Sequence, residues 1–187
     1  MAYFPMYMDM SHLKVLVVGA GYIATEKLEK LVDFTDHITI IAPDVDLEAQ
    51  KLIDKYDLTL YKKEYEIGDI QGFDIVIVAT TEALQQAIYE ESRVHKILVN
   101  SVDNKAYCDF IFPSYLHKGD LSIAFSTGGA SPAFAKRLRQ HMESILPESV
   151  GEFLENMKSL RTSLPKGKER MQYFEKQVET YFTQHFK

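Results

Sequence analysis

The sequence predicts an α/β fold: a parallel sheet with helices on both faces, then a small α+β region and a helical C-terminal domain. Over about the first 105 residues, short apolar runs of strand length alternate with helical patterns. This order forms parallel strands joined by right-handed crossovers. A glycine-rich turn separates the first strand run from the first helix. Beyond residue 112 the alternation stops, and three helical patterns follow a pair of strand-like runs.

Five runs are predicted to form the parallel sheet. The fourth is apolar enough to lie centrally, because strands covered by helices on both faces read as continuous hydrophobic stretches. The third is more polar and is predicted to lie at an edge. In chain order the runs are LKVLVVGAG, HITIIAP, LTLYKKEY, FDIVIVAT and KILVNSV.

The segments between these runs are predicted to be helices. In the first, apolar residues recur at helical spacing, at Ile23, Leu28, Leu31 and Val32. Each segment joins one strand to the next as a crossover. The three predicted helices are YIATEKLEKLVDF, DLEAQKLIDKYD and TEALQQAIYEESRVH.

The second part of the chain begins with two strand-like runs that the turn sequence HKGD joins into an antiparallel pair. A helix is predicted to start at Ser131, because serine caps helices and the following Pro132 suits the first helical position. Two more helices are predicted in ESVGEFLENMKSL and KERMQYFEKQVETYF. The last has an apolar stripe, interpreted as core or subunit contact, made of Met171, Phe174, Val178 and Phe182.

Composition and charge exclude several classes of protein. The net charge of −6 argues against general nucleic-acid binding, and the apolar runs are too short to span a membrane. The N-terminal sequence has no signal-peptide pattern, and one cysteine excludes an intrachain disulfide. A cytoplasmic protein is therefore expected. Residues 116–187 hold 11 Lys and Arg against 8 Asp and Glu, which fits either an anionic ligand or solvated helix faces.

The sequence GAGYIA lies between the first strand and the first helix. Gly19 and Gly21 permit a tight turn in which backbone N–H groups approach a pyrophosphate, and Ala24 permits close packing of the helix on the strand. In this context the pattern predicts a Rossmann-like domain that binds a dinucleotide. The alternative is a turn that is tight for packing alone.

An acid after the second strand is expected to bind the ribose hydroxyls of the dinucleotide. Asp44 is the candidate, with Asp46 and Glu48 as close alternatives. No arginine follows this strand to bind a 2′-phosphate, so NAD is favoured over NADP.

Polar residues follow the fourth and fifth strands, at the edge where a doubly wound sheet binds its ligand. Thr80 and Thr81 are predicted to contact the cofactor, to cap the next helix, or both. Asn100 and Asp103 are expected near the nicotinamide. From position alone, Asp103 is equally well a general base or a turn cap.

No metal site is predicted. Cys108, Asp109 and His117 match no standard zinc spacing, and Cys108 flanks an apolar run, so a structural cysteine is the favoured interpretation. The glycine-rich turn STGGASP opens a helix and is either an anion site or a plain capped turn.

Four segments together closely resemble the precorrin-2 dehydrogenase family, the N-terminal module of siroheme synthases. They are GAGYIATEK, DIVIVATT, VNSVDNKAYCDFIFPS and LSIAFSTGGASPAFAKRLRQHME, within residues from about 11 to 146. The resemblance implies a homodimeric enzyme that oxidises precorrin-2 to sirohydrochlorin with NAD+ as hydride acceptor. Some members also insert Fe2+ to give siroheme.

The resemblance assigns roles to individual positions. Asp103 falls on the catalytic aspartate of the family. The implied cofactor-binding residues are Gly19, Gly21, Tyr22, Ile23, Pro43, Asp44, Thr80 and Thr81. The substrate-binding residues expected from position and resemblance are Asn100, Ser126, Thr127, Gly128 and Arg137.

The expected domains are an NAD-binding domain at 1–112, a dimerisation and substrate-side region at 113–146, and a helical domain at 147–187. The sequence departs from the family pattern at two places. After the glycine motif, Glu26 stands where the family often has a basic residue, and around Asp103 the sequence SVDN replaces the usual VVDD or VVDA. Two alternatives are a non-catalytic module that binds NAD(H) or a tetrapyrrole, and a chelatase without dehydrogenase activity.

Overall fold

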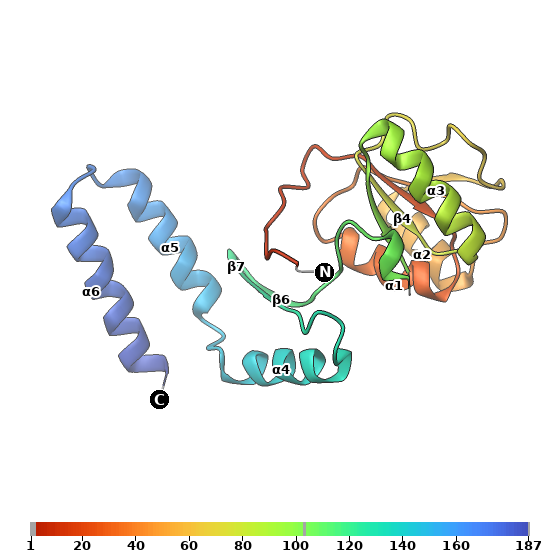
Figure 1. The fold of residues 1–187 in the computed structure, drawn as a ribbon. Helices are drawn as coiled ribbons and strands as arrows, with labels where there is room; N and C mark the ends of the chain where they lie inside the picture. The colour runs from red at the N-terminus through yellow and green to blue at the C-terminus, as the bar shows by residue number, and fades with distance from the viewer. Residues whose placement is uncertain (1–2, 103, 187) are drawn as a thin grey trace. The chain divides into compact units, whose positions relative to one another are not determined.

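The computed structural model describes residues 3–102 and 104–186, which divide into two compact units. The first unit runs from Tyr3 to Ile111, and the second begins at Phe112. Figure 1 shows the chain coloured from its N-terminus to its C-terminus. Among the described residues, no helix has both the length and the apolarity that crossing a membrane would need.

The first unit contains a five-stranded sheet in the order β3-β2-β1-β4-β5, and every neighbouring pair is parallel. This confirms the predicted parallel sheet, with β3 at an edge and β4 inside. The strands are β1 (Val15–Val18), β2 (Ile38–Ile41), β3 (Thr59–Tyr61), β4 (Ile75–Val78) and β5 (Leu98–Ser101).

Three helices cover this sheet: α1 (Tyr22–Leu31), α2 (Leu47–Tyr56) and α3 (Glu82–His95). From β1 the chain moves through β2 to β3 in one direction, whereas β4 and β5 lie on the other side of β1. Right-handed crossovers therefore place α1 and α2 on one face and α3 on the other, as Figure 1 shows around β4. The order reverses between β1 and β4, where such sheets bind ligands.

The core explains why the central strands are so apolar. All four residues of β1 and all four of β4 are buried, because helices cover both faces. One cluster joins Leu16, Val76 and Val99 of the sheet to Ile88 of α3. This packing fixes the carboxyl ends of β1, β4 and β5 relative to one another.

The connection from β3 to β4 differs from the prediction, because the strand expected to reach Tyr65 ends at Tyr61. Beyond it the chain is bound to α3. Glu91 accepts a hydrogen bond from the Tyr65 hydroxyl at 2.6 Å and another from the Gly68 amide at 2.7 Å. Burial and this bond to Glu91 raise the pKa of Tyr65. The loop is therefore held by side chains far away in the sequence, which local strand propensity does not reveal.

The second unit begins with an antiparallel pair, β6 (Ser114–Lys118) and β7 (Leu121–Phe125), which confirms the predicted hairpin. Helix α4 (Pro132–Ile145) packs on both strands. Its predicted cap is confirmed, since Ser131 Oγ accepts a hydrogen bond from the Phe134 amide at 3.2 Å.

Helices α5 (Val150–Ser163) and α6 (Lys168–His185) complete this unit and lie side by side, antiparallel, in Figure 1. The rings of Phe153 and Tyr181 stack with their centroids 4.0 Å apart, and the Tyr181 hydroxyl lies 2.9 Å from Ser149 Oγ. The hairpin turn meets α5 at two glycines: a Cβ at Gly119 would lie 2.9 Å from the Cα of Gly151.

Candidate functional site

The glycine turn after β1 packs closely against the residues that follow β4. Gly19 has a φ of +101°, and a Cβ there would collide with the carbonyl oxygen of Ala79 and lie 3.2 Å from Thr80 Cγ2. The Gly19 amide donates to the carbonyl of Ile41 at 2.8 Å. Only glycine fits this position, so the turn holds β1, β2 and β4 together at the carboxyl edge of the sheet.

Helix α1 begins directly after this turn, with Gly21 as its N-cap and no side-chain cap. Its first amides are thus left for a ligand or solvent, and the positive end of the helix dipole favours a pyrophosphate. Tyr22 and Ile23 are exposed in this first turn, whereas Ala24 is buried. Ala24, the third small residue of the glycine motif, is therefore packed in the core, as the sequence predicted.

The acid beside the glycine turn is Asp46. Its Oδ2 atom lies 3.8 Å from where a Cβ on Gly21 would be, and its amide donates to the carbonyl of Ala20 at 2.9 Å. Asp46 is the N-cap residue of α2, but its side chain makes no cap hydrogen bond. Its carboxylate is therefore available for a ribose. Pro43 and Asp44 are exposed just before it.

Thr80 carries a buried hydroxyl that has no hydrogen-bond partner among the described residues. Its methyl group packs at Gly19, so the hydroxyl lies beside the glycine turn. Thr81 is the N-cap of α3 but makes no side-chain cap bond, so its hydroxyl does not act as the helix cap. A buried polar group without a partner is costly unless a ligand or water satisfies it, so Thr80 fits a cofactor-contacting residue.

Two more polar residues lie at this edge, and the sequence reasoning missed both. Gln85 of α3 donates to the Thr80 carbonyl at 2.9 Å, while its Oε1 has no partner among the described residues. The hydroxyl of Ser101, the last residue of β5, is likewise buried and unpaired there. The signal available in the sequence was a polar residue at a position where the strand or helix pattern requires an apolar one.

Asn100 is almost fully buried at the end of β5, where it holds the returning chain. Its amide donates to the Phe110 carbonyl at 2.8 Å, and its backbone pairs with Cys108 in an antiparallel bridge. Asp103, the predicted catalytic residue, lies outside the described residues. The prediction for Asp103 therefore stays a prediction.

Cys108 has the structural role that the sequence favoured. Its sulfur accepts a hydrogen bond from the Ser101 amide at 3.2 Å and lies 3.0 Å from the Ser101 carbonyl and 3.3 Å from that of Asn104. Burial raises the pKa of the Cys108 thiol, so the thiol keeps the proton that it donates to a carbonyl. Within residues 3–102 and 104–186, no three His, Cys, Asp or Glu residues are grouped to hold a metal.

Asp109 binds the same segment to α3 and to β5. Its carboxylate accepts bonds from Arg93 Nη1 at 2.8 Å and Nη2 at 2.6 Å, and from the Val99 amide at 2.8 Å. Asp109 raises the pKa of the Arg93 guanidinium. Asn104 Nδ2 also donates to Glu82 at the start of α3, at 3.1 Å. Together with Cys108, these bonds fasten the segment that follows β5 to both β5 and α3.

The predicted substrate-side residues of the second unit organise the turn before α4. Ser126 Oγ accepts a bond from the Gly128 amide at 3.1 Å, and Thr127 Oγ1 accepts one from the Ser131 amide at 3.0 Å. Gly128 has a φ of +60°. Arg137 is exposed on α4. Arg139, two residues further along the same helix, forms an ion pair with Glu143.

Comparison with known proteins agrees with these features. Residues 6–114 match a family described as "Putative NAD(P)-binding", and residues 118–145 match one described as "Sirohaem biosynthesis protein central". The siroheme synthase of Pseudoalteromonas atlantica is 38% identical over 162 residues, which cover 84% of this chain and 35% of that protein. That of Methylococcus capsulatus is 34% identical over 184 residues, covering 96% and 39%.

The chain thus spans between about a third and two-fifths of the length of these curated relatives. A solved structure titled "SirC, precorrin-2 dehydrogenase" aligns with 90% of this chain and 85% of its own, at 29% identity and a TM-score of 0.74. The resemblance and the fold class expected from the sequence are therefore confirmed. Because the first match covers more than half of its residues, the chain belongs to the family of NAD(P)-binding domains.

Proposed function

We propose that this chain oxidises precorrin-2 to sirohydrochlorin with NAD+ as hydride acceptor, a step of siroheme biosynthesis. The observation that carries the proposal is the glycine turn in a chain that aligns with a precorrin-2 dehydrogenase over 90% of its length. Beside this turn lies the Thr80 hydroxyl, which is buried and has no hydrogen-bond partner within residues 3–102 and 104–186. A cytoplasmic homodimer is part of the same proposal.

NAD+ would supply the hydride acceptor, and the residues of the first unit would bind and orient it. The free amides at the start of α1, beside Gly19 and Gly21, suit the pyrophosphate. Thr80 offers its hydroxyl from the end of β4, and Tyr22 and Ile23 flank the pyrophosphate site. Pro43, Asp44 and Thr81 remain proposed contacts from the resemblance.

We assign the ribose hydroxyls to Asp46 in preference to Asp44. The support is the position of the Asp46 carboxylate beside Gly21 and the hydrogen bond of its amide to Ala20. A carboxylate there accepts hydrogen bonds from two ribose hydroxyls and repels a 2′-phosphate. This assignment accounts for a preference for NAD over NADP.

Asp103 is the proposed proton acceptor, because dehydrogenation removes a proton together with the hydride. Cys108 and Asp109 would act on it indirectly, by fixing the chain that follows it. On the substrate side, the proposal includes Asn100, Ser126, Thr127, Gly128 and Arg137. The Arg137 guanidinium would pair with carboxylates of the tetrapyrrole.

The test is to incubate the purified protein with precorrin-2 and NAD+ and to follow NADH and sirohydrochlorin. We expect both to form in equal amounts, and Asp103→Ala to lose turnover while its NAD+ affinity stays within about twofold. If neither product appears while an authentic precorrin-2 dehydrogenase works in parallel, the proposal is wrong. A second assay with sirohydrochlorin and Fe2+, with and without NAD+, separates the chelatase alternative from an NAD(H)- or tetrapyrrole-binding module.

A further inference from the structure

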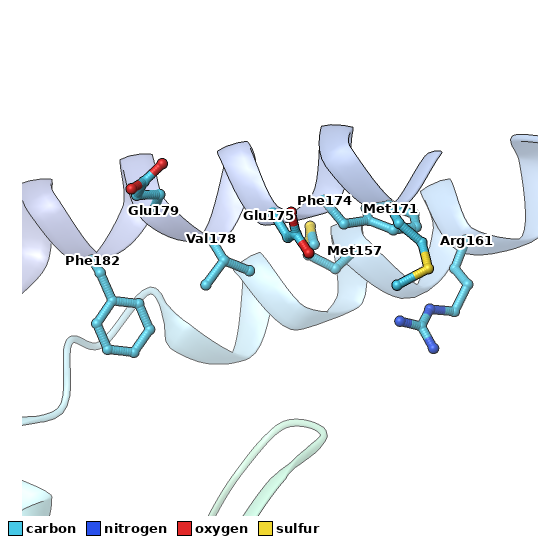
Figure 2. Close-up of a pocket in the computed structure, with 8 residues that line it drawn as sticks. All are labelled: Met157, Arg161, Met171, Phe174, Glu175, Val178, Glu179 and Phe182. Carbon is cyan, nitrogen blue, oxygen red and sulfur yellow. The ribbon is translucent and has the colours of Figure 1, made fainter. Parts of the chain in front are cut away.

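The apolar stripe predicted on the last helix lines a groove between α5 and α6, but this lining does not identify a partner. The groove has a volume of about 730 Å3 and is lined by Met157, Arg161, Met171, Phe174, Glu175, Val178, Glu179 and Phe182 (Figure 2). Most of these side chains are apolar, and apolar contacts have no direction, so many partners would fit. Buried hydrogen-bonding groups are more informative, because each one specifies the donor or acceptor that it needs.

Two such groups lie in the layer between α3 and the sheet. Gln85 and Ser101 are only 6% and 3% exposed, and neither Gln85 Oε1 nor Ser101 Oγ has a hydrogen-bond partner among the described residues. Ile88 of α3 and Val99 of β5 belong to one core cluster. Gln85 precedes Ile88 by about one helical turn, and Ser101 follows Val99 by two residues, so both side chains face this layer at the carboxyl edge of the sheet.

Other hydrogen bonds of the same two residues hold them in place. Gln85 Nε2 donates to the Thr80 carbonyl at 2.9 Å, which leaves the side-chain oxygen as an acceptor. The Ser101 amide donates to Cys108 Sγ at 3.2 Å, and the Ser101 carbonyl accepts from the same sulfur at 3.0 Å, which leaves the hydroxyl as a donor. The two residues therefore offer one acceptor and one donor, positioned by α3 and β5.

We propose that Gln85 and Ser101 bind the carboxamide of the nicotinamide ring. Gln85 Oε1 accepts a hydrogen bond from the NH2 group, and Ser101 Oγ donates one to the carbonyl oxygen. The contact presupposes the NAD+ binding proposed above. Both oxygens are covered in the free chain, so the side chains around them change rotamer as the ring binds.

Chemistry and position both favour the carboxamide as the partner. A carboxamide carries a donor and an acceptor on one carbon, whereas a pyrophosphate or a carboxylate of the tetrapyrrole would offer the Gln85 oxygen only further acceptors. β4 and β5 lie on one side of β1, and β2, which Asp46 follows, lies on the other. A dinucleotide that crosses the switch point between β1 and β4, with its adenosine ribose at Asp46, places its nicotinamide half at β4 and β5.

Titration calorimetry with NAD+ and with ADP-ribose tests the contact, because ADP-ribose keeps both riboses but lacks the nicotinamide. Ser101→Ala should weaken NAD+ binding by about fivefold, the effect of one hydrogen bond, and should change ADP-ribose binding by less than about twofold. The melting temperature of this variant without ligand should stay equal or rise, because a buried hydroxyl without a partner is removed.

The outcomes that contradict the contact are distinct. Equal losses of affinity for both ligands would assign the hydroxyl to the second ribose. An unchanged NAD+ affinity with a lower melting temperature would show that the hydroxyl binds an internal water only. Because the titration needs no precorrin-2, a chain that gives the expected affinities but does not oxidise precorrin-2 would refute the proposed function and not this contact.

The analogue 3-acetylpyridine adenine dinucleotide isolates Gln85, because a methyl group replaces the NH2 group and the carbonyl remains. The wild-type chain should bind it about fivefold more weakly than NAD+. In Gln85→Met the two affinities should agree within about twofold, whereas Ser101→Ala should keep the wild-type ratio. Gln86→Met is the matched control, because Gln86 is exposed on the same helix and bonds to Glu90.

An unchanged ratio in Gln85→Met would show that Gln85 acts only by holding the Thr80 carbonyl, and its contact with the carboxamide would be wrong. If Gln85→Met does not fold, the comparison of NAD+ with ADP-ribose in Ser101→Ala still decides whether the carboxamide binds here.

Discussion

At the scale of single residues, the proposed preference for NAD over NADP rests on one carboxylate. Asp46 lies beside Gly21, and its backbone amide donates a hydrogen bond to the Ala20 carbonyl, whereas Asp44 lies two residues earlier in the chain. The proposed ribose contact of Asp46 therefore rests on the distance between the acid and the glycine turn, and not on the number of residues after β2.

We therefore expect Asp46→Asn to weaken NAD+ binding by about tenfold or more, since hydrogen bonds to a charged group contribute about 1.5–3 kcal/mol. The affinity for NADP+ should fall less or even rise, because the repulsion between its 2′-phosphate and the carboxylate disappears. Isothermal titration with both cofactors measures the ratio, with Asp44→Asn as the matched control. A larger effect of Asp44→Asn would move the assignment to Asp44.

The Thr80 hydroxyl gives a prediction in which stability and binding change in opposite directions. Without cofactor it is buried and unpaired among the described residues, so Thr80→Val should leave the melting temperature of the free protein equal or higher. NAD+ binding should weaken by several-fold, because the variant lacks the hydrogen bond. Thermal unfolding with and without NAD+ tests both halves, and a variant that loses stability but keeps its affinity would contradict the assignment.

At the scale of elements, Cys108 links the end of β5 to the 3-10 helix η1 (Lys105–Tyr107). Burial raises the pKa of its thiol above the ordinary value of 9.0. The folded chain therefore keeps this proton to a higher pH than the unfolded chain. The stability gained from the neutral thiol is complete below pH 9 and is lost as the pH rises through the folded pKa.

Urea unfolding at pH 8 and pH 10 measures this effect. The wild-type chain should lose more free energy of unfolding between the two values than Cys108→Ser, whose hydroxyl does not titrate in this range. Tyrosines and lysines titrate equally in both proteins, so the difference between them isolates the thiol. An equal loss in both would mean that the thiol is not held in its neutral form.

The contact between the β6–β7 turn and α5 depends on two glycines. Gly119 has a φ of +57°, and a Cβ there would lie 2.9 Å from the Cα of Gly151. Gly119→Ala should therefore destabilise the second unit by about 2–4 kcal/mol, from backbone strain and overpacking together. Gly128→Ala is the matched control, because its φ is +60° and no atom lies within 4 Å of a Cβ there. If calorimetry shows that the two variants lose the same stability, backbone strain at positive φ alone accounts for the loss at Gly119.

Local patterns predicted most elements but not the side chains that hold them. β1 and β4 were predictable because every residue of both strands is apolar and buried. β3 was predicted too long, since Glu91 binds the chain after it from the distant α3. Gln85 and Ser101 were not predicted, because only the assembled edge of the sheet shows that they are buried with oxygens that have no partner in the described part of the chain.

At the scale of the whole molecule, the two units divide the proposed tasks. The glycine turn, Asp46 and Thr80 all lie in the first unit, whereas the turn at 126–131 lies in the second. The first unit also has its own core, centred on β1, β4 and α3. It therefore has what a cofactor-binding domain needs to fold by itself.

We expect a fragment of residues 1–111 to fold and to bind NAD+ with an affinity within about threefold of that of the full chain, because every proposed cofactor contact lies within it. Saturating NAD+ at a hundred times its dissociation constant should stabilise both proteins by about 2.7 kcal/mol. The fragment should not oxidise precorrin-2, since it lacks Ser126, Thr127 and Arg137. Titration calorimetry and thermal unfolding measure the binding, with Gly19→Ala in the same fragment as the control that should fail to bind. A folded fragment with no affinity for NAD+ would show that the second unit completes the cofactor site.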